Sequence, residues 1–196
     1  MCKNMPPLEL AIQFHGHICP GLLIGVRAAE LAQKQLEVGQ DSDEELVAIV
    51  ENDNCSVDAI QSILGCTFGK GNLVFKDYGK NVYTIISRDS GRALRIAQKF
   101  GSTAGPASER FRELGGKPIL TDEEAGEKET LIGEIFEKIM SMPAEDLFAW
   151  QEVVVELPQR ASIRKTVRCD SCGEGVMETR ASSRDGQILC PECQLK

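Results

Sequence analysis

The chain has 196 residues, a formal net charge of −8 and 42% hydrophobic residues. This length suits one core domain of roughly 150 residues with a small appendage. The acidic balance makes nucleic acid an unfavourable partner, and no apolar run approaches the roughly 18 residues of a membrane-spanning helix, so we expect no membrane association. The start of the chain lacks the basic segment and apolar run of a signal peptide. We therefore expect a cytoplasmic protein with reduced cysteines.

The first half of the chain predicts short helices mixed with short strands, from apolar periodicity and from the positions of proline and glycine. The predicted helices cover residues 6–14, 20–38 and 56–64, and the predicted strands cover residues 46–50, 72–77 and 82–87. Pro20 suits the first position of the second helix, and Gly39 suits its end. The turn-forming residues 78–81 predict that the last two strands form a hairpin.

The second half predicts more helix, followed by one strand and a linker. Helices are predicted at residues 91–100, at 107–114 and from 121 to about 140, with a further turn at 143, a strand at 150–157 and a linker at 159–166. Thr121 and Glu124 have the spacing of a capping box. Helices and strands do not alternate as a doubly wound sheet requires, so we predict an α+β core over residues 1–160.

Both histidines and seven of the eight cysteines lie in three short stretches. In the last stretch, Cys169 and Cys172 form one Cys-x-x-Cys pair and Cys190 and Cys193 form another. This spacing predicts a zinc ribbon over residues 161–196, in which four thiolates close a structural Zn²⁺ site. A module this small needs the metal for much of its folding energy.

Two roles are open for this ribbon, whose hairpin we predict from segments 176–180 and 187–189. It can staple the fold and dock on the core or on a partner. It can also contact nucleic acid through its local arginines and lysines, which the acidic remainder of the chain makes the less favoured interpretation.

The first stretch places His15, His17 and Cys19 at alternate positions. On an extended segment all three side chains point the same way. Pro20 disfavours helical geometry at Cys19, which would then lie at a helix N-terminus that favours a thiolate. We expect Cys55 to repeat this helix N-terminal arrangement, because it follows a predicted strand and leads into the predicted helix at 56–64. We predict that His17, Cys19 and Cys55 bind Zn²⁺ or iron and leave a fourth position open, with His15 as a nearby base or as the alternate ligand.

Each of these residues also has a simpler interpretation, because a His-x-His pair is often a hydrogen-bonding pair and a lone cysteine is usually a core residue. Cys66 follows an apolar helix end and is predicted to be buried packing, and Cys2 is incidental. Residues 65–72 only superficially resemble a phosphate-binding loop, because the spacing before Gly-Lys is one residue short and no Ser or Thr follows. A glycine-rich bend there could present Thr67 and Lys70 to an anion, or it is a simple loop.

Four ordered segments resemble the family of the E-subunit of formylmethanofuran dehydrogenase. They are Phe-His-Gly-His-Ile-Cys-Pro-Gly-Leu at 14–22, Asn-Cys-Ser-Val-Asp-Ala-Ile-Gln at 54–61, Gly-Cys-Thr-Phe-Gly-Lys-Gly-Asn-Leu at 65–73, and Asp-Tyr-Gly-Lys at 77–80. The tail resembles the TraR/DksA-type zinc finger that some members carry. The resemblance implies a mixed or antiparallel sheet packed on helices, a metal-associated pocket at the His-x-His-x-Cys and Asn-Cys segments, and a homodimer.

The functional hypothesis is a metal-dependent enzyme, or a component of a larger enzyme complex, in C1 or related redox metabolism. It is not a complete dehydrogenase, because too few cysteines remain to ligate iron–sulfur clusters and there is no dinucleotide fingerprint. Thr67 and Lys70 would orient a small anionic substrate, and the catalytic set would be His15, His17, Cys19, Cys55 and Lys70. Without metal, Cys19 or Cys55 would be a nucleophile. The alternatives are a non-catalytic accessory protein that docks through its ribbon and a regulator whose ribbon contacts nucleic acid or polymerase.

Overall fold

The computed structural model describes residues 5–196 of the chain. They form two compact units, here called the core unit, which ends at Arg160, and the tail unit, Ala161–Lys196. Within the described residues, no helix combines the length and the apolar character needed to cross a membrane.

The core unit is built on a five-stranded mixed sheet with the order β2-β1-β3-β4-β5. Its strands are β1 (Leu46–Val50), β2 (Leu73–Phe75), β3 (Val82–Ser87), β4 (Ala93–Gln98) and β5 (Phe148–Glu152). β2 runs parallel to β1, and the other neighbouring pairs are antiparallel. The fold class is therefore the predicted one, a mixed sheet packed on helices.

The predicted hairpin between β2 and β3 is wrong, because both strands pair with β1 instead of with each other. β1 is buried along its whole length and takes a central place between them. The intervening turn carries the chain past the end of β1, where the backbone N–H of Lys80 donates to the carbonyl of Glu51 at 2.9 Å. The turn-forming residues therefore correctly predicted that the chain turns between β2 and β3, but the two strands that the turn connects do not pair with each other.

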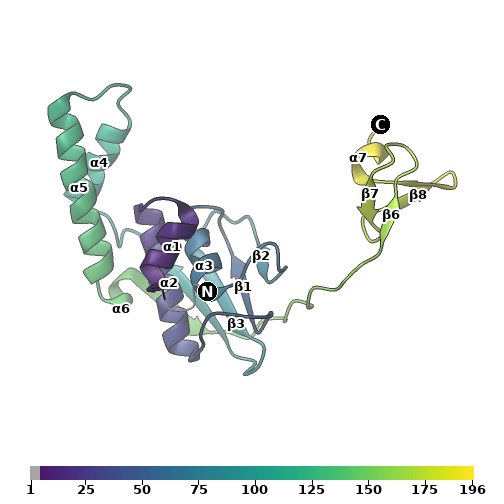
Figure 1. Cartoon of the computed structure of the whole chain (residues 1–196). Helices are drawn as coiled ribbons and strands as arrows, with labels where there is room; N and C mark the ends of the chain where they lie inside the picture. Colours follow the sequence, from purple (N-terminus) through teal and green to yellow (C-terminus); the bar gives the residue numbers. More distant parts are fainter. Residues whose placement is uncertain (1–4) are drawn as a thin grey trace. The chain divides into compact units, whose positions relative to one another are not determined.

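Two helices, α2 (Pro20–Leu36) and α3 (Ser56–Leu64), cover one face of the sheet, and α1 (Pro7–His15) packs on these two helices (Figure 1). Alternate strand residues such as Val50, Tyr83 and Ile96 point to this face and pack with α2 and α3 in the main core. α2 ends two residues earlier than predicted, because Glu37, at φ 56°, takes the left-handed conformation that we expected of Gly39.

The helix predicted at residues 91–100 is wrong, since Ala93–Gln98 is strand β4. Its residues include strong helix formers, yet β4 is hydrogen-bonded to β3 on one side and to β5 on the other. Pairing on both edges and burial of Leu94 and Ile96 against the helices outweigh a weak local preference.

The remaining helices of the core unit are α4 (Pro106–Gly115), α5 (Asp122–Ser141) and α6 (Ala144–Leu147). The capping box of Thr121 and Glu124 is confirmed at the start of α5. At its other end the guanidinium of Arg27 donates to the carbonyls of Ile139, Met140 and Met142 at 2.6, 2.8 and 2.7 Å. These bonds satisfy carbonyls that a helix end leaves without partners and fix α5 against α2.

The predicted strand at residues 150–157 is only partly right, because β5 ends at Glu152. Val153 and Val155 then pack on Val47, Ile49 and Ile86, on the sheet face opposite to the helices. The alternating valines have the pattern of a strand, but beyond Glu152 they cover the sheet instead of extending it.

The tail unit contains two small sheets and one short helix. β6 (Thr166–Arg168) pairs with β7 (Gly175–Met177), β8 (Ser182–Arg184) pairs with β9 (Gln187–Leu189), and α7 (Pro191–Gln194) follows. The hairpin predicted from segments 176–180 and 187–189 is therefore wrong in its partners. The β8–β9 turn consists of Asp185 and Gly186, both with positive φ, as a tight hairpin turn requires.

Candidate metal centres

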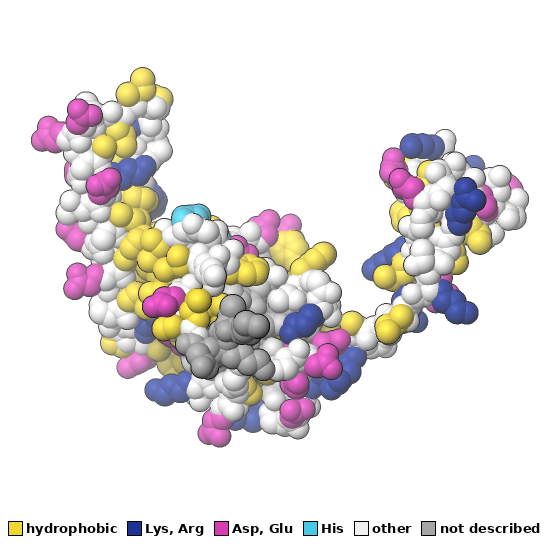
Figure 2. Space-filling model, viewed as in Figure 1, with side chains coloured by type: hydrophobic (Ala, Val, Ile, Leu, Met, Phe, Trp, Pro, Cys, Tyr) yellow, Lys and Arg dark blue, Asp and Glu magenta, His cyan; other side chains and the backbone are white. Residues whose placement is uncertain are grey.

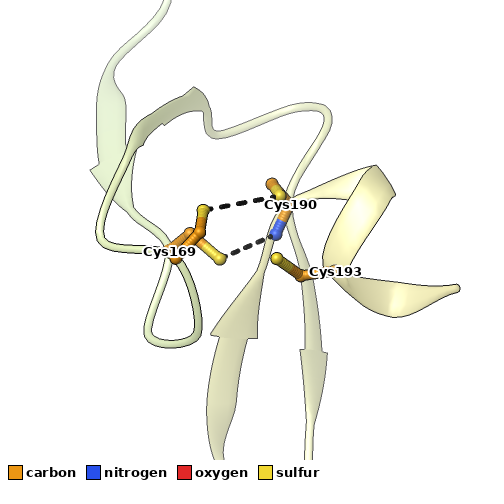
Figure 3. Close-up of side chains that lie close together, drawn as sticks. Cys169, Cys190 and Cys193 are labelled. Atoms are coloured by element: carbon orange, nitrogen blue, oxygen red, sulfur yellow. Dashed lines mark hydrogen bonds between the residues drawn. The ribbon is translucent and has the colours of Figure 1, made fainter. Parts of the chain in front are cut away.

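The four cysteines of the tail unit converge on one point. Their sulfur atoms all lie within 4.8 Å of one another, and Sγ of Cys172 is 4.0 Å from Sγ of Cys190. Figure 3 shows Cys169, Cys190 and Cys193 pointing toward each other from the two Cys-x-x-Cys segments. A tetrahedral zinc ion with bonds of about 2.3 Å separates its sulfurs by about 3.8 Å, so the cluster fits Zn²⁺.

Backbone N–H groups prepare the buried member of this cluster to bind metal. Those of Cys172 and Cys190 hold the pKa of Cys169 at about 6, and the N–H of Cys190 lies 3.4 Å from the Cys169 sulfur. This lowered pKa favours the thiolate of Cys169, the form that binds zinc.

In the core unit, Cys19 lies at the N-terminus of α2, as the sequence predicted. Its backbone is extended, and its sulfur accepts the N–H of Leu22 at 3.4 Å. The sulfur thus occupies the position of a capping oxygen, where the helix dipole favours negative charge.

His15, the last residue of α1, faces Cys19 with one ring nitrogen and the carboxylate of Asp58 with the other. Its Nδ1 lies 2.6 Å from Oδ2 of Asp58, and its Nε2 lies 3.8 Å from Sγ of Cys19. Because a carboxylate only accepts, Nδ1 carries a proton, and in the neutral imidazole Nε2 is then the unprotonated nitrogen that faces the sulfur. This arrangement orients His15 in the way that metal-ligating histidines are usually oriented.

His17 is more exposed than His15, and the two rings are 4.5 Å apart between centroids. Donor atoms of His15, His17 and Cys19 lie within 4.8 Å of one another. Figure 2 shows histidine atoms at the surface of the core unit. Both histidines can therefore reach a metal at Cys19, but the structure orients only His15 through a carboxylate.

Cys55 approaches Cys19 from the start of α3, but the donor atoms that lie within 4.8 Å of one another are those of His15, His17 and Cys19, without Cys55. The local geometry at Cys55 also differs from that at Cys19. Its backbone is helical, and its side chain forms no capping bond. Oδ1 of Asn54 caps α3 instead, accepting the N–H of Ser56 at 2.9 Å. The predicted repetition of the Cys19 geometry is wrong in this respect.

Glycine on α2 brings the two cysteines together. A Cβ at Gly21 would lie 3.2 Å from Cβ of Cys55 and 4.0 Å from the sulfurs of both Cys19 and Cys55. Burial, together with the nearby Cys19 sulfur, raises the pKa of the Cys55 thiol. One turn further, a Cβ at Gly25 would lie 2.2 Å from the backbone oxygen of Ser56. The two helices can cross this closely only because both positions are glycine.

A buried polar network supports the segment around Cys55. The hydroxyl of Tyr83 donates to Oγ of Ser56 at 2.6 Å, and the hydroxyl of Ser56 in turn donates to Oδ1 of Asn54 at 2.5 Å. Sequence reasoning missed Asp58, Asn54 and Tyr83. Asp58 had one available signal, its position three residues after Cys55 on the same helical face.

A cavity of about 420 Å³ opens beside Cys55. Its polar wall includes His15, Asn54, Cys55 and Asp58, and its apolar wall includes Phe68 and Phe75. A small molecule in this cavity would lie next to the His15–Cys55 side of the cluster.

The predicted anion-binding residues Thr67 and Lys70 do not line this cavity. The ammonium of Lys70 pairs with Asp41, whose side chain is fully buried. Oγ1 of Thr67 accepts the backbone N–H of Lys70 at 3.2 Å. Lys70 therefore has a structural partner, and its role toward an anion stays a prediction.

The two remaining cysteines are not part of the cluster. Cys66 is fully buried in the main core, and burial raises its pKa to about 12, so its predicted packing role is confirmed. Cys2 lies outside the described residues.

Together, the mixed sheet under three helices, the His/Cys cluster and the four-cysteine ribbon define an α+β metal-binding protein with a zinc finger. Residues 14–149 match the family model described as "FmdE, Molybdenum formylmethanofuran dehydrogenase operon", and the chain belongs to this family. Residues 163–196 match the prokaryotic dksA/traR C4-type zinc finger. Both resemblances inferred from the sequence are thereby confirmed.

Two known proteins are similar to nearly the whole chain. One is a tungsten formylmethanofuran dehydrogenase FmdE-like protein from Syntrophus aciditrophicus, whose crystal structure has a TM-score of 0.66 and 26% identity over 95% of this chain and 89% of that one. The other is a "Probable S-adenosyl-L-methionine-binding protein" from Archaeoglobus fulgidus, 36% identical over 191 residues. The match covers 93% of this chain but 51% of the relative, so the chain spans about half its length.

Proposed function

We propose that the core unit is a cytoplasmic, metal-dependent enzyme or enzyme component in C1 or related redox metabolism. It would hold one zinc or iron ion with Cys19, Cys55 and a histidine. The observation that supports this most directly is the line from Asp58 through His15 to Cys19. It favours His15 as the ligand and leaves His17 as the alternate, the reverse of the assignment made from sequence.

The separation of Cys19 and His15 supports these two members of the donor set. Around a tetrahedral zinc ion, a thiolate sulfur and an imidazole nitrogen lie about 3.6 Å apart, from bonds of about 2.3 and 2.05 Å. The observed separation of Cys19 Sγ and His15 Nε2 is 3.8 Å. Two thiolates and a neutral imidazole would also give a formally uncharged centre, which tolerates partial burial better than the tail site does.

Three protein ligands would leave one coordination position free, and two of them, His15 and Cys55, line the 420 Å³ cavity. When bound, a zinc ion in such a site supplies a Lewis acid for a carbonyl group or for water. Side chains of the core unit would orient the ligand histidine and bind the substrate. Asp58 would fix the tautomer of His15, and Phe68 and Phe75 would contact the apolar part of a substrate.

The named ligand of the Archaeoglobus relative, S-adenosyl-L-methionine, is the first small molecule to test. Phe68 and Phe75 offer flat apolar surfaces for an adenine ring, and Asp53, which also lines the cavity, offers a carboxylate for ribose hydroxyls. Binding would be measured by calorimetry on the intact chain.

The second candidate is a non-catalytic accessory or regulatory protein that docks through its ribbon. The tail unit exposes Ile163, Met177 and Leu195, with Ile163 and Leu195 at 105% and 89% relative exposure. Apolar side chains on a unit with so small a core suit contact with a partner. We also propose that the chain forms a homodimer and takes part in a larger complex. Light scattering of the parent chain and of a variant without the tail cysteines tests the homodimer.

Cys55→Ser tests the metal site of the core unit. The intact chain, purified without oxygen, is expected to carry about two equivalents of metal, and Cys55→Ser about one, because a neutral hydroxyl is a poor zinc ligand. Elemental analysis of the variants measures this. Cys66→Ala, a buried cysteine outside the cluster, is the matched control and should keep two. An unchanged metal content in Cys55→Ser would falsify the ligand set.

Asp58→Asn tests the orientation of His15. An amide can donate to Nδ1 and so place the proton on Nε2, where it blocks the lone pair. We expect the core metal to bind about 10- to 100-fold more weakly, measured by competition with a chromophoric chelator. Asp53→Asn removes a carboxylate from the same cavity without touching His15. Equal weakening in both variants would indicate a general loss of charge instead.

A further inference from the structure

We infer that the cavity beside Cys55 binds a substrate that carries an organic cation, an alkylated ammonium or sulfonium group, instead of the anionic group expected from the sequence. This inference rests on the proposed function and specifies the substrate class of the same site. Three features of the lining carry it: two carboxylates, no lysine or arginine from the described part of the chain, and two phenylalanines with exposed rings.

The charged side chains at this cavity are acidic. Asp53 and Asp58 both line it, and no lysine or arginine among residues 5–196 does. Lys70 is paired with Asp41, and Lys76 lines a different cavity, on the sheet face opposite to the helices. A metal held by two thiolates and a neutral imidazole would add no net charge. The two carboxylates therefore leave the cavity negative, and a negative cavity attracts cations.

Asp53 is the carboxylate that is available to a ligand. It follows β1, it is exposed, and its carboxylate has no ion pair or hydrogen bond with any of residues 5–196. Asp58 uses both of its oxygens within the protein, because Oδ2 lies 2.6 Å from Nδ1 of His15 and Oδ1 accepts Nε2 of Gln61 at 3.3 Å. A bound cation would therefore pair with Asp53, and Asp58 would add to the negative field.

Strand register places Phe75 at this cavity, on the helix-covered face of the sheet. Phe75 is the last residue of β2 and pairs with Val50, the last residue of β1. Val50 belongs to the main core under α2 and α3, and Asp53 lies three residues further along the chain. The Phe75 side chain is 49% exposed although it lines the cavity. An open aromatic ring and an unpaired carboxylate thus lie beyond the same end of β1.

Hydrogen bonds from α3 fix the loop that carries the second ring. The side chain of Gln61 bonds to Asp58 through its amide nitrogen, and its Oε1 accepts the backbone N–H of Phe68 at 3.2 Å. The side chain of Phe68 is nevertheless 83% exposed. The backbone of Phe68 is therefore fixed to the helix that begins at Cys55, while its ring stays open to a ligand in the cavity.

The rings and the apolar wall limit what kind of cation fits. A phenyl face attracts a cation within about 6 Å of its centroid. The remaining wall includes Val50, Val57 and Leu73, and a primary ammonium would lose strong hydration against it. An alkylated ammonium or sulfonium is less strongly hydrated and presents methyl groups that pack on rings and aliphatic side chains. A phosphate or carboxylate would instead meet two carboxylates.

Choline and its neutral carbon isostere, dimethylbutanol, test the role of charge on the intact, metal-loaded protein. The two molecules have nearly the same shape, so we expect choline to bind about tenfold or more tightly than its isostere. Asp53→Asn should reduce this preference because it removes the carboxylate, and Phe68→Leu because it keeps an apolar side chain but removes the aromatic face. Asp43→Asn and Phe100→Ala, exposed residues outside the cavity, should keep it. Ligand-observed NMR measures both affinities.

S-adenosyl-L-methionine and S-adenosylhomocysteine form a second matched pair, in which only the first molecule carries a sulfonium. A preference of about tenfold or more for the first would identify a sulfonium ligand, and a preference confined to choline an alkylated ammonium. Equal binding within both pairs, no binding of either cation, or a preference unchanged in both Asp53→Asn and Phe68→Leu would overturn the inference. Self-association that Phe68→Leu abolishes, without any preference for a cation, would overturn it as well and identify a protein-docking surface.

Metal content separates this inference from the proposed function. Asp53→Asn and Phe68→Leu should keep the metal content of the parent, because neither residue belongs to the ligand set. A parent chain with no core metal would contradict the proposed function, while the preference for a cation could still be measured. A loaded core site in a chain that binds neither cation would overturn the inference alone.

Discussion

Loss of zinc is expected to unfold the tail unit and to leave the core unit folded. The buried residues of the tail unit are Cys169, Leu189 and Cys193, so among its described residues only one buried apolar side chain is not a cysteine. A core this small cannot offset the entropy of ordering the chain. Zinc bound to four thiolates contributes apparent binding energies of about 10–16 kcal/mol in comparable modules.

Cys193→Ser removes one buried ligand of the tail site and tests this directly. Hydrogen exchange followed by mass spectrometry should show protection lost across β6 to α7 and kept in β1, β3 and β4. The main core of the chain lies entirely within the core unit. Cys55→Ser is the matched control, because it removes a cysteine without affecting the tail ligands. Retained protection in the tail of Cys193→Ser would show that zinc does not provide its folding energy.

The tail site was predictable because its ligands are local. Each Cys-x-x-Cys pair lies on one turn, and two such pairs at this spacing leave little choice of chemistry. The partners of the small strands were not predictable, because β7 lies between two strands in sequence, β6 and β8, and could pair with either. The register depended on the turn at Asp185 and Gly186, which sequence reasoning placed inside a longer loop.

The candidate site of the core unit shows where local reasoning stops. Proline after Cys19 predicted its place at a helix N-terminus, which the structure has. Asp58 could not be assigned to His15, since 43 residues separate them and only the packing of α1 on α3 brings them together. The sequence predicted that Lys70 binds an anion, and here too the contact that matters is distant. Its ion-pair partner Asp41 is 29 residues away and buried, so the pairing could not be inferred from the sequence.

Strand β4 illustrates the same limit for the fold. Its sequence is acceptable to a helix, and the alternation of Leu94 and Ile96 is too short to decide between the two periods. Hydrogen bonds from β3 on one edge and β5 on the other stabilise this segment as a strand. Residues with ambiguous local preference take the structure that their neighbours complete.

Gly25→Ala is expected to destabilise the core unit by about 3 kcal/mol or more. The added methyl carbon would lie 2.2 Å from the carbonyl oxygen of Ser56 and 2.7 Å from its Cα. These are backbone atoms at the first turn of α3, so no side-chain rotation relieves the overlap. α2 and α3 would have to move apart, and with them Cys19 and Cys55, which lie at the N-termini of these helices.

Urea unfolding of Gly25→Ala, read together with its metal content, separates this effect from a general loss of helix quality. Gly133→Ala, in the interior of α5 with no atom within 4 Å of the added carbon, is the matched control. It should raise stability by up to about 1 kcal/mol, because alanine favours helix. Gly21→Ala should fall between the two, since the closest atom to its added carbon would be the Cβ of Cys55, at 3.2 Å, with the sulfurs of Cys19 and Cys55 at 4.0 Å. If Gly25→Ala proves as stable as Gly133→Ala, the close crossing of α2 and α3 does not hold the two cysteines together.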